Sequence, residues 1–210
     1  GYPGTTGANC IDYIIADKFL IPKESQKHYS EKIVYMPNTY QPNDSKRKIS
    51  DKVFTREELG LPKDGFVFCC FNQNNKITPN VFDIWMRLLK KVKDSTLWLL
   101  MGNKTAKKNL NQEAKKRGID SGRLIFAERI PLPEHLARHK VADLFIDTFP
   151  YTAHTTCSDA LWAGLPVLTL VGESFASRVA SSLLNAISLP VLITHTAKEY
   201  EDSAVELATN

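Results

Sequence analysis

The sequence has few cysteines and no long apolar run, and these absences narrow the classes of protein to which it can belong. Cys10, Cys69, Cys70 and Cys157 show neither C-x-x-C spacing nor the rhythm of a disulfide framework. We therefore expect a reducing compartment, the cytoplasm, or cytoplasm and nucleus in a eukaryote. No run of about 18 apolar residues, the length that crosses a bilayer, occurs, so we expect no membrane partner.

Several nucleotide and hydrolase motifs are missing as well. The sequence contains no G-x-G-x-x-G, no G-x-x-x-x-G-K-[ST] and no G-x-S-x-G, which argues against a dinucleotide oxidoreductase, a P-loop NTPase and an α/β-hydrolase. The start of the chain, Gly1–Gly4, has neither an initiator Met nor a signal-peptide pattern. We expect the chain to begin inside a longer protein.

The composition is that of an ordinary globular protein. With 210 residues, of which 43% are hydrophobic and 24% charged, the chain can bury the core of one domain plus a fragment. Its net charge of +4 comes from lysines scattered over several segments, with no aromatic residues interleaved. This pattern indicates a solvated surface and not a nucleic-acid partner.

The chain divides at a polar stretch near its beginning. Two short apolar runs, Ile11–Ala16 and Lys32–Met36, are predicted strands, with a helix around Lys23–Tyr29 between them. From Asn38 to Lys52 almost nothing is apolar, which is typical of a linker. We therefore assign residues 1–45 to the tail of a preceding lobe and residues 46–210 to a second lobe.

The second lobe alternates short apolar runs with helical patterns. The predicted strands are Phe66–Phe71, Thr96–Met101, Leu124–Phe126, Leu144–Ile146, Val167–Leu170 and Val191–Ile193. The predicted helices are Pro79–Val92, a basic helix ending at Arg117, Pro133–Ala142, Thr155–Ala163, Ala176–Ile187 and one from Ala197. This order predicts an α/β fold, a Rossmann-like parallel sheet with helices on both faces.

The stretch DLFIDTFPYTAHTTCSDALWAGLPVLTL combines a strand, a polar loop, a helix and a strand. Its loop is expected at the carboxyl edge of the sheet, where the first turn of the following helix favours an anion. His154, Thr155 and Thr156 lie at that turn, and Asp159 can accept hydrogen bonds from the hydroxyls of a sugar. The alternative is that a threonine simply caps the helix and Asp159 interacts with its dipole.

Two further polar segments follow predicted strands, one a loop and the other the start of the helix predicted at Pro133–Ala142. In FNQNNK, Gln73 and Lys76 can reach a diphosphate, although a polar turn with a capping Thr78 explains the same residues. In PEHLARH, His135 and Arg138 are candidate anion donors. His135 and His139 do not predict a zinc site, because the sequence offers neither a third ligand nor a Glu after the first His.

Together these loops resemble the protein O-GlcNAc transferase family, inverting glycosyltransferases of the GT-B fold that use UDP-GlcNAc. The agreement runs in order through GYPGTTGA, DYII, YSEKIVYMP, FNQNNKI, LWLL, HTT-x-x-D-x-LWAG-x-P and GE-x-x-ASRVA-x-S. The donor-binding residues that the resemblance implies are Gln73, Lys76, Leu100, Ile130 through its backbone, His135, Arg138, His154, Thr155, Thr156 and Asp159. Lys76 and His154 are the two expected to act in catalysis, on the departing diphosphate.

The resemblance implies the remaining assignments too. The chain would hold the end of the amino-terminal catalytic lobe and most of the donor-binding lobe of a transferase that links GlcNAc to Ser or Thr of protein acceptors. UDP-GlcNAc is its substrate, and no metal or other cofactor is expected. The family's proposed catalytic His, its helical repeats and a carboxyl-terminal segment would lie outside these residues, so we expect this piece alone to be inactive.

The sequence departs from the family at three positions. Leu132 stands where the family has a lysine that helps to hold the diphosphate, Asn75 replaces an aromatic residue, and Ala153 replaces a glycine. Two alternatives therefore stay open. One is a non-catalytic module that binds a nucleotide sugar or acts as a scaffold. The other is a related transferase with another donor, such as GDP-fucose, as in the plant SPINDLY-type proteins.

Overall fold

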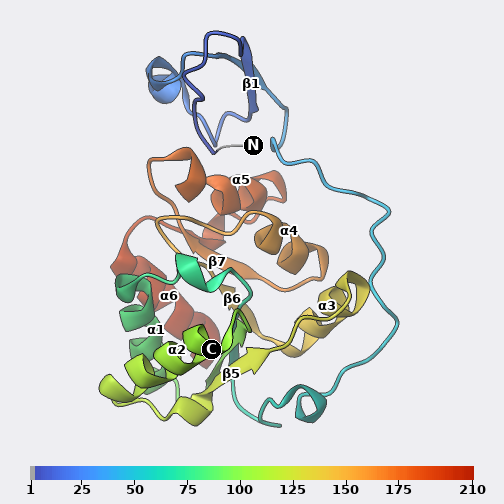
Figure 1. The fold of residues 1–210 in the computed structure, drawn as a ribbon, viewed down its shortest axis with the longest axis vertical. Helices are drawn as coiled ribbons and strands as arrows, with labels where there is room; N and C mark the ends of the chain where they lie inside the picture. Colours follow the sequence, from blue (N-terminus) through green and yellow to red (C-terminus); the bar gives the residue numbers. More distant parts are fainter. Residues whose placement is uncertain (1–2) are drawn as a thin grey trace.

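A computed structural model describes residues 3–210, which form a small two-stranded sheet and a large six-stranded sheet (Figure 1). Gly1 and Tyr2 of the GYPGTTGA motif lie outside the described residues. The small sheet pairs β1 (Tyr13–Ala16) with β2 (Lys32–Tyr35). The large sheet contains β3 (Val67–Cys70), β4 (Thr96–Leu100), β5 (Leu124–Ala127), β6 (Leu144–Ile146), β7 (Val167–Leu170) and β8 (Ile193–Thr194).

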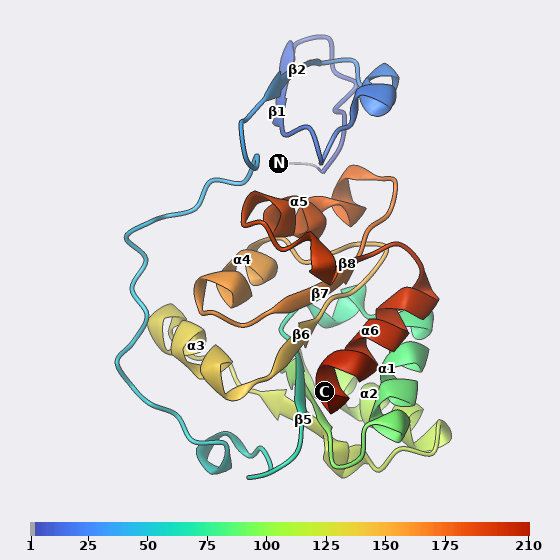
Figure 2. The ribbon, with the colours of Figure 1, turned by 180° about the vertical axis from the view of Figure 1, so that it is seen from behind.

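The large sheet is parallel throughout and has the order β5-β4-β3-β6-β7-β8. The α-helices are α1 (Pro79–Lys91), α2 (Lys104–Lys116), α3 (Leu132–Arg138), α4 (Thr155–Trp162), α5 (Val179–Ala186) and α6 (Ala197–Thr209). Helices α1, α2 and α6 cover one face, and α3, α4 and α5 cover the other (Figure 2). The predicted Rossmann-like fold is therefore confirmed.

No helix within residues 3–210 is long and apolar enough to cross a membrane.

Burial follows the sequence pattern that predicted the elements. All four residues of β3 are buried, including Cys69 and Cys70, as a strand covered on both faces requires. Helix α1 buries its apolar side, with Trp85 and Leu88 fully enclosed. Thr78 caps this helix by accepting a hydrogen bond from Val81 N at 3.4 Å, as expected for a threonine before Pro79.

Some predicted helices are shorter than the apolar pattern suggested. The segment expected as a helix around 23–29 is a 3-10 helix at Lys23–His28, and the helix expected over 133–142 ends at Arg138, followed by a 3-10 turn. The segment expected as a helix from Ala176 begins as a 3-10 turn at Phe175–Ser177. There the Ser177 hydroxyl donates to Ser174 O at 2.8 Å, a local bond that competes with helical geometry.

The small sheet contacts the large lobe through buried polar groups. The Asp17 carboxylate accepts hydrogen bonds from Tyr40 N at 3.0 Å and from the Ser182 hydroxyl at 2.7 Å. Arg178 donates to Phe19 O of the first segment at 2.8 Å and to Gly172 O of the large lobe at 3.0 Å. Residues 38–52, the linker segment, then run along the side of α4 and α3 (Figures 1 and 2).

Candidate functional site

The candidate site lies where the strand order changes direction. Strands β3 and β6 are neighbours, with Phe68 opposite Leu144, although the chain passes through β4 and β5 between them. Loops that leave two such strands diverge, and the crevice between them is where open α/β sheets bind ligands. The loops are residues 71–78 after β3 and residues 147–154 after β6.

A buried polar network joins these two loops. Asn72 Nδ2 donates to Asp147 Oδ1 at 3.0 Å and to the Thr148 hydroxyl at 2.8 Å, while its Oδ1 accepts from the Thr156 hydroxyl. Asp147 also accepts from Ala153 N at 2.8 Å. Burial raises the pKa of Asp147 to about 6, and these hydrogen bonds oppose that shift. The network fixes the backbone that presents the candidate residues.

Helices α6 and α1 contact the loop after β6 through Tyr200 and Trp85. The Tyr200 hydroxyl donates to Asp147 O at 2.9 Å and accepts from Trp85 Nε1 at 3.2 Å. The Thr169 hydroxyl donates to Asp147 Oδ2 at 2.7 Å.

Sequence reasoning missed Asn72 and Asp147. The signal that could have found them is a polar residue directly after each of two buried strands.

Lys76 reaches from the β3 loop to the β6 loop. Its Nζ donates to Thr152 O at 2.9 Å and lies 4.1 Å from the centre of the Tyr151 ring. Desolvation lowers the pKa of Lys76, and the nearby Asp147 carboxylate raises it. The structure thus places the lysine against the loop that carries His154.

The first turn of α4 is open to a ligand. His154 precedes the helix and caps it with no side-chain hydrogen bond, and neither Thr155 nor Thr156 is a cap, so the capping alternative for the threonines is wrong. Thr155 is exposed, and Thr156 bonds to Asn72. The His154 ring stacks on Tyr151 with centroids 4.9 Å apart. Desolvation, followed by repulsion from Lys76, lowers the pKa of His154 to about 4, so the ring is neutral near pH 7. Its Nε2 lies 3.4 Å from Ala176 O, and since a carbonyl only accepts, the ring proton is on Nε2.

His135 and Arg138 lie together on α3, and Arg138 is fully buried. Arg138 Nη2 bonds to His135 Nδ1 at 2.7 Å, and its Nη1 donates to Glu128 O at 2.7 Å. A guanidinium can only donate, so His135 Nδ1 accepts and its proton is on Nε2. Burial lowers the pKa of His135 to about 3. His139 Nδ1 donates to His135 O at 2.7 Å, and Asp143 pairs with Arg56 at 2.8 Å.

Gln73 and Leu100 line a cavity of about 300 Å³ at the carboxyl ends of β3 and β4. Asn75 and Arg129 also line it, and Asn74 Nδ2 donates to Leu100 O at 3.2 Å. Ile130 lies three residues beyond the end of β5 and is half-buried. This side of the site is therefore open, and its side chains make few bonds to one another.

Asp159 lies one turn into α4 and is almost fully buried. Its Oδ1 accepts a hydrogen bond from Arg47 of the linker segment. Desolvation raises the pKa of Asp159, and Arg47 opposes that shift. Sequence reasoning missed Arg47, because a polar linker has no periodicity from which a contact could be inferred.

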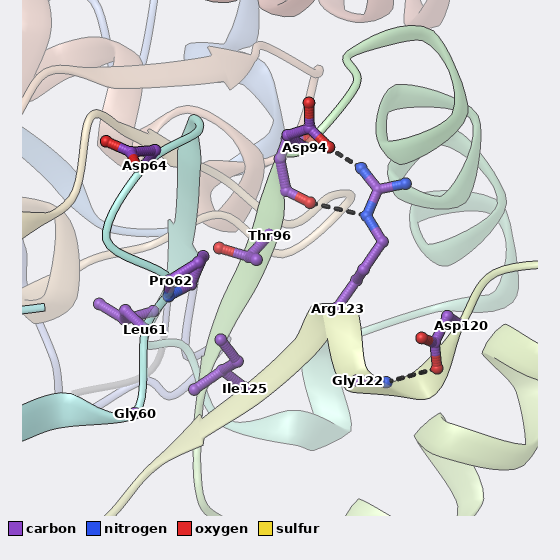
Figure 3. A pocket seen from close by; sticks show the side chains of 11 residues that line it. Gly60, Leu61, Pro62, Asp64, Asp94, Thr96, Asp120, Gly122, Arg123 and Ile125 are labelled. Carbon is purple, nitrogen blue, oxygen red and sulfur yellow. Dashed lines mark hydrogen bonds between the residues drawn. The ribbon is translucent and has the colours of Figure 1, made fainter. Parts of the chain in front are cut away.

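A second cavity, of about 560 Å³, lies at the opposite, amino edge of the sheet (Figure 3). The carboxylates of Asp64, Asp94 and Asp120 surround it. Its Arg123 donates to Ser95 O at 2.7 Å and to the Ser95 hydroxyl at 2.9 Å, so this cation already has partners. The surroundings suit an anion poorly. No group of three or more His, Cys, Asp or Glu side chains that could hold a metal occurs within residues 3–210.

Comparisons with known proteins show the family to which the chain belongs. The model of glycosyl transferase family 41 matches residues 1–52 and 43–210. The chain is 40% identical to a probable UDP-N-acetylglucosamine–peptide N-acetylglucosaminyltransferase, SEC of Arabidopsis thaliana, over 100% of the chain and 22% of that protein. It is also 40% identical to the Caenorhabditis elegans UDP-N-acetylglucosamine–peptide N-acetylglucosaminyltransferase, over 74% of the chain and 14% of that protein.

Solved structures give the same result for the fold. A mutant O-GlcNAc transferase from Thermobaculum terrenum superposes with a TM-score of 0.86 at 31% identity, over 100% of the chain and 39% of that structure. A glycosyltransferase from Rickettsia africae, at 10% identity and a TM-score of 0.53, shares the fold over 94% of the chain and 58% of that structure. The chain spans less than a quarter of the two curated relatives' lengths. By its match to the family model and its identity to these relatives, the chain belongs to glycosyl transferase family 41.

Proposed function

We propose that this chain is the donor-binding part of a metal-independent, inverting transferase that moves GlcNAc from UDP-GlcNAc to Ser or Thr of a protein. The observation that carries the proposal is the convergence of Lys76, His154 and the open first turn of α4 at the β3–β6 crevice. A cation, a neutral imidazole and free backbone N–H groups suit a diphosphate.

The chemistry assigns a role to each part of the site. When the acceptor hydroxyl attacks the anomeric carbon, the bond to UDP breaks and negative charge develops on the β-phosphate. Lys76 stabilises that charge electrostatically, with hydrogen bonds from the Thr155 hydroxyl, from the backbone N–H groups of Thr155 and Thr156, and from His154 once its Nε2–H turns from Ala176 O to the phosphate. Asp159 accepts from the ribose. Gln73, Leu100, Ile130 through its backbone, and His135 surround the nucleoside, and Arg138 orients His135.

The proposal includes the two lobes, the parts of the enzyme outside this chain and the compartment. Residues 1–45 are the tail of an amino-terminal lobe, and residues 46–210 are the nucleotide-sugar lobe. The base that deprotonates the acceptor, the rest of the first lobe and any helical repeats lie outside these residues, so the 210-residue chain binds UDP without transferring sugar. The compartment is cytoplasmic, or nucleocytoplasmic in a eukaryote, with protein acceptors and no nucleic-acid or membrane partner.

A second candidate is a module that binds a nucleotide sugar without transferring it, or a transferase with another donor such as GDP-fucose. Two positions favour keeping it: Leu132, which is 47% exposed at the start of α3, and Asn75, which is exposed beside the cavity. Leu132 carries no charge where the family resemblance implies a lysine, and Asn75 has no ring where it implies an aromatic side chain.

One experiment separates these functions. The longer protein that contains this chain is incubated with a Ser/Thr peptide library and radiolabelled UDP-GlcNAc, UDP-GalNAc or GDP-fucose, with and without excess EDTA. We expect label from UDP-GlcNAc in both conditions. Label only from GDP-fucose would change the donor, no label would leave a binding module, and activity restored by Mg²⁺ or Mn²⁺ alone would contradict metal independence.

A further inference from the structure

The linker segment makes a specific contact with α4 beside the candidate site. Trp162 Nε1 donates to Arg47 O at 3.2 Å, and the Ser158 hydroxyl donates to the Asn43 side chain. Between these two contacts, Arg47 Nη1 donates to Asp159 Oδ1. Three residues on one side of α4 therefore hold the segment, and the central one is the carboxylate assigned to the ribose.

The Arg47–Asp159 pair is enclosed. The side chains are 15% and 8% exposed, and the guanidinium lies 5.6 Å from the centre of the Trp162 ring. Arg47 Nε and Nη2 are buried and donate to no atom of residues 3–210. Within that range, Asp159 is the carboxylate that Arg47 pairs with, and the pair leaves Asp159 Oδ2 without a protein donor.

Because the pair is enclosed, Arg47 affects how readily the Asp159 carboxylate takes up a proton. An isolated carboxylate in a desolvated site tends to take up a proton, and a protonated carboxyl accepts hydrogen bonds less well and donates one. The positive charge of Arg47 lowers the pKa of Asp159 against the desolvation that raises it, and its bond to Oδ1 leaves Oδ2 as the oxygen without a donor among residues 3–210. The free oxygen can accept from the two vicinal hydroxyls of a ribose.

We propose that Arg47 is a positioning residue that makes the site selective for ribose over 2′-deoxyribose, by binding Asp159 through Oδ1 so that Oδ2 accepts from the sugar. This inference rests on the proposed function, because its ligand is the UDP moiety of the donor. Arg47 itself does not touch the nucleotide. A nucleotide without the 2′-hydroxyl loses a hydrogen bond to a charged acceptor, so it should bind about tenfold more weakly.

The test is calorimetry of UDP and 2′-deoxy-UDP with the 210-residue chain and four variants. Wild type should prefer UDP by about tenfold, and Arg47→Met and Asp159→Asn should each reduce this preference below about threefold. Arg47→Lys should restore part of it, because it keeps the charge. The matched control is Arg87→Met, which breaks a pair with Glu201 on α6 far from the ribose carboxylate and should leave the preference unchanged. Urea unfolding shows that each variant is folded.

Three results would overturn the inference alone. One is an Arg47→Met variant that keeps the full preference. Another is an Arg47→Met variant that binds UDP more tightly than wild type, because Arg47 would then compete with the nucleotide. The third is a wild-type chain that binds UDP and 2′-deoxy-UDP equally, which would leave the proposed function standing. A folded wild-type chain that binds neither nucleotide would overturn the donor site and this inference together.

Discussion

The two halves of the candidate site are built differently. The β3–β6 half consists of Asn72, Lys76, Asp147, His154 and Thr156. The second half consists of Gln73 and Asn75 from the loop after β3, Leu100 at the end of β4, and Arg129 and Ile130 after β5. In the first half, buried hydrogen bonds tie each loop to the other, whereas in the second the side chains line an open cavity of about 300 Å³.

This difference separates two tasks. Electrostatic stabilisation of a leaving diphosphate needs donors whose positions are fixed before the reaction, and the buried network around Asp147 fixes them. Recognition of the nucleoside tolerates an open surface, because direct contacts form when the ligand arrives. We therefore expect stability and catalysis to depend on the first half, and the choice of donor on the second.

The largest effect should come from removing the carboxylate at the centre of the network. Asp147→Ala leaves the buried donors of Asn72, Ala153 and Thr169 unpaired, so the free energy of unfolding should fall by about 3 kcal/mol. Urea denaturation measures it. Asp202→Ala, which removes an exposed partner of Lys198, is the control and should change it by less than about 0.5 kcal/mol. A loss of under about 1 kcal/mol for Asp147→Ala would mean that the network does not hold the loops.

The second prediction concerns Lys76. In the longer protein, Lys76→Ala should lower both turnover and donor affinity more than about tenfold, because a charge-assisted bond to the diphosphate is lost. Steady-state kinetics and calorimetry measure the two quantities, with the exposed Lys108→Ala as control. If both stay within about threefold of wild type, Lys76 does not have the assigned role.

The third prediction concerns pH. Burial lowers the pKa of His135 to about 3 and of His139 and His154 to about 4. In the unfolded chain each has a pKa of about 6.5, so the unfolded state takes up protons below that pH while the folded state does not. Their contribution to stability is full above about pH 6.5 and is lost as the pH falls toward about 4.

Asp147 acts in the opposite direction. Its pKa is raised to about 6 in the folded state, so protonation favours folding as the pH falls below that value. Urea denaturation between about pH 4 and pH 7 should show His154→Gln flattening the loss of stability and Asp147→Asn steepening it. Unchanged slopes for both variants would contradict the burial assigned to these groups.

The smallest effect should come from the open side of the site. Leu132→Lys places a cation on an exposed position at the start of α3, where the family resemblance implies a lysine. UDP affinity should rise about two- to fivefold at low salt and less at high salt, because exposed charges are screened. Leu189→Lys is the control, since Leu189 is 38% exposed after α5 and away from the cavity. Equal gains from both variants would show only a net-charge effect.

Sequence patterns predicted the order of strands and helices, because apolar spacing reports which face of each element is buried. They also placed polar loops at the carboxyl ends of strands. The spacing of apolar residues does not report which distant segments contact one another. The bonds from Asn72 to Asp147 and from Arg47 to Asp159 join residues 75 and 112 positions apart.

Arg138 shows that local sequence also does not report the burial of a charged side chain. Arg138 lies three residues after His135 in a predicted helix that follows a strand, where we expected an anion donor, and in sequence nothing distinguishes it from one. In the fold its guanidinium lies 4.8 Å from the centre of Phe71 and is fully buried. Burial follows from packing between α3 and β3, which local sequence does not report.

The measurement that tests the donor site most directly is calorimetry of UDP with the 210-residue chain alone. The loops proposed to face the diphosphate all belong to the large lobe, so the chain should bind UDP with a dissociation constant on the order of 10 to 1000 μM and transfer no sugar. We expect this modest affinity because, in the proposed function, excluding water from the phosphates needs a first lobe of which residues 1–45 are only the tail. A chain that melts cooperatively yet binds no UDP at millimolar concentration would contradict the account.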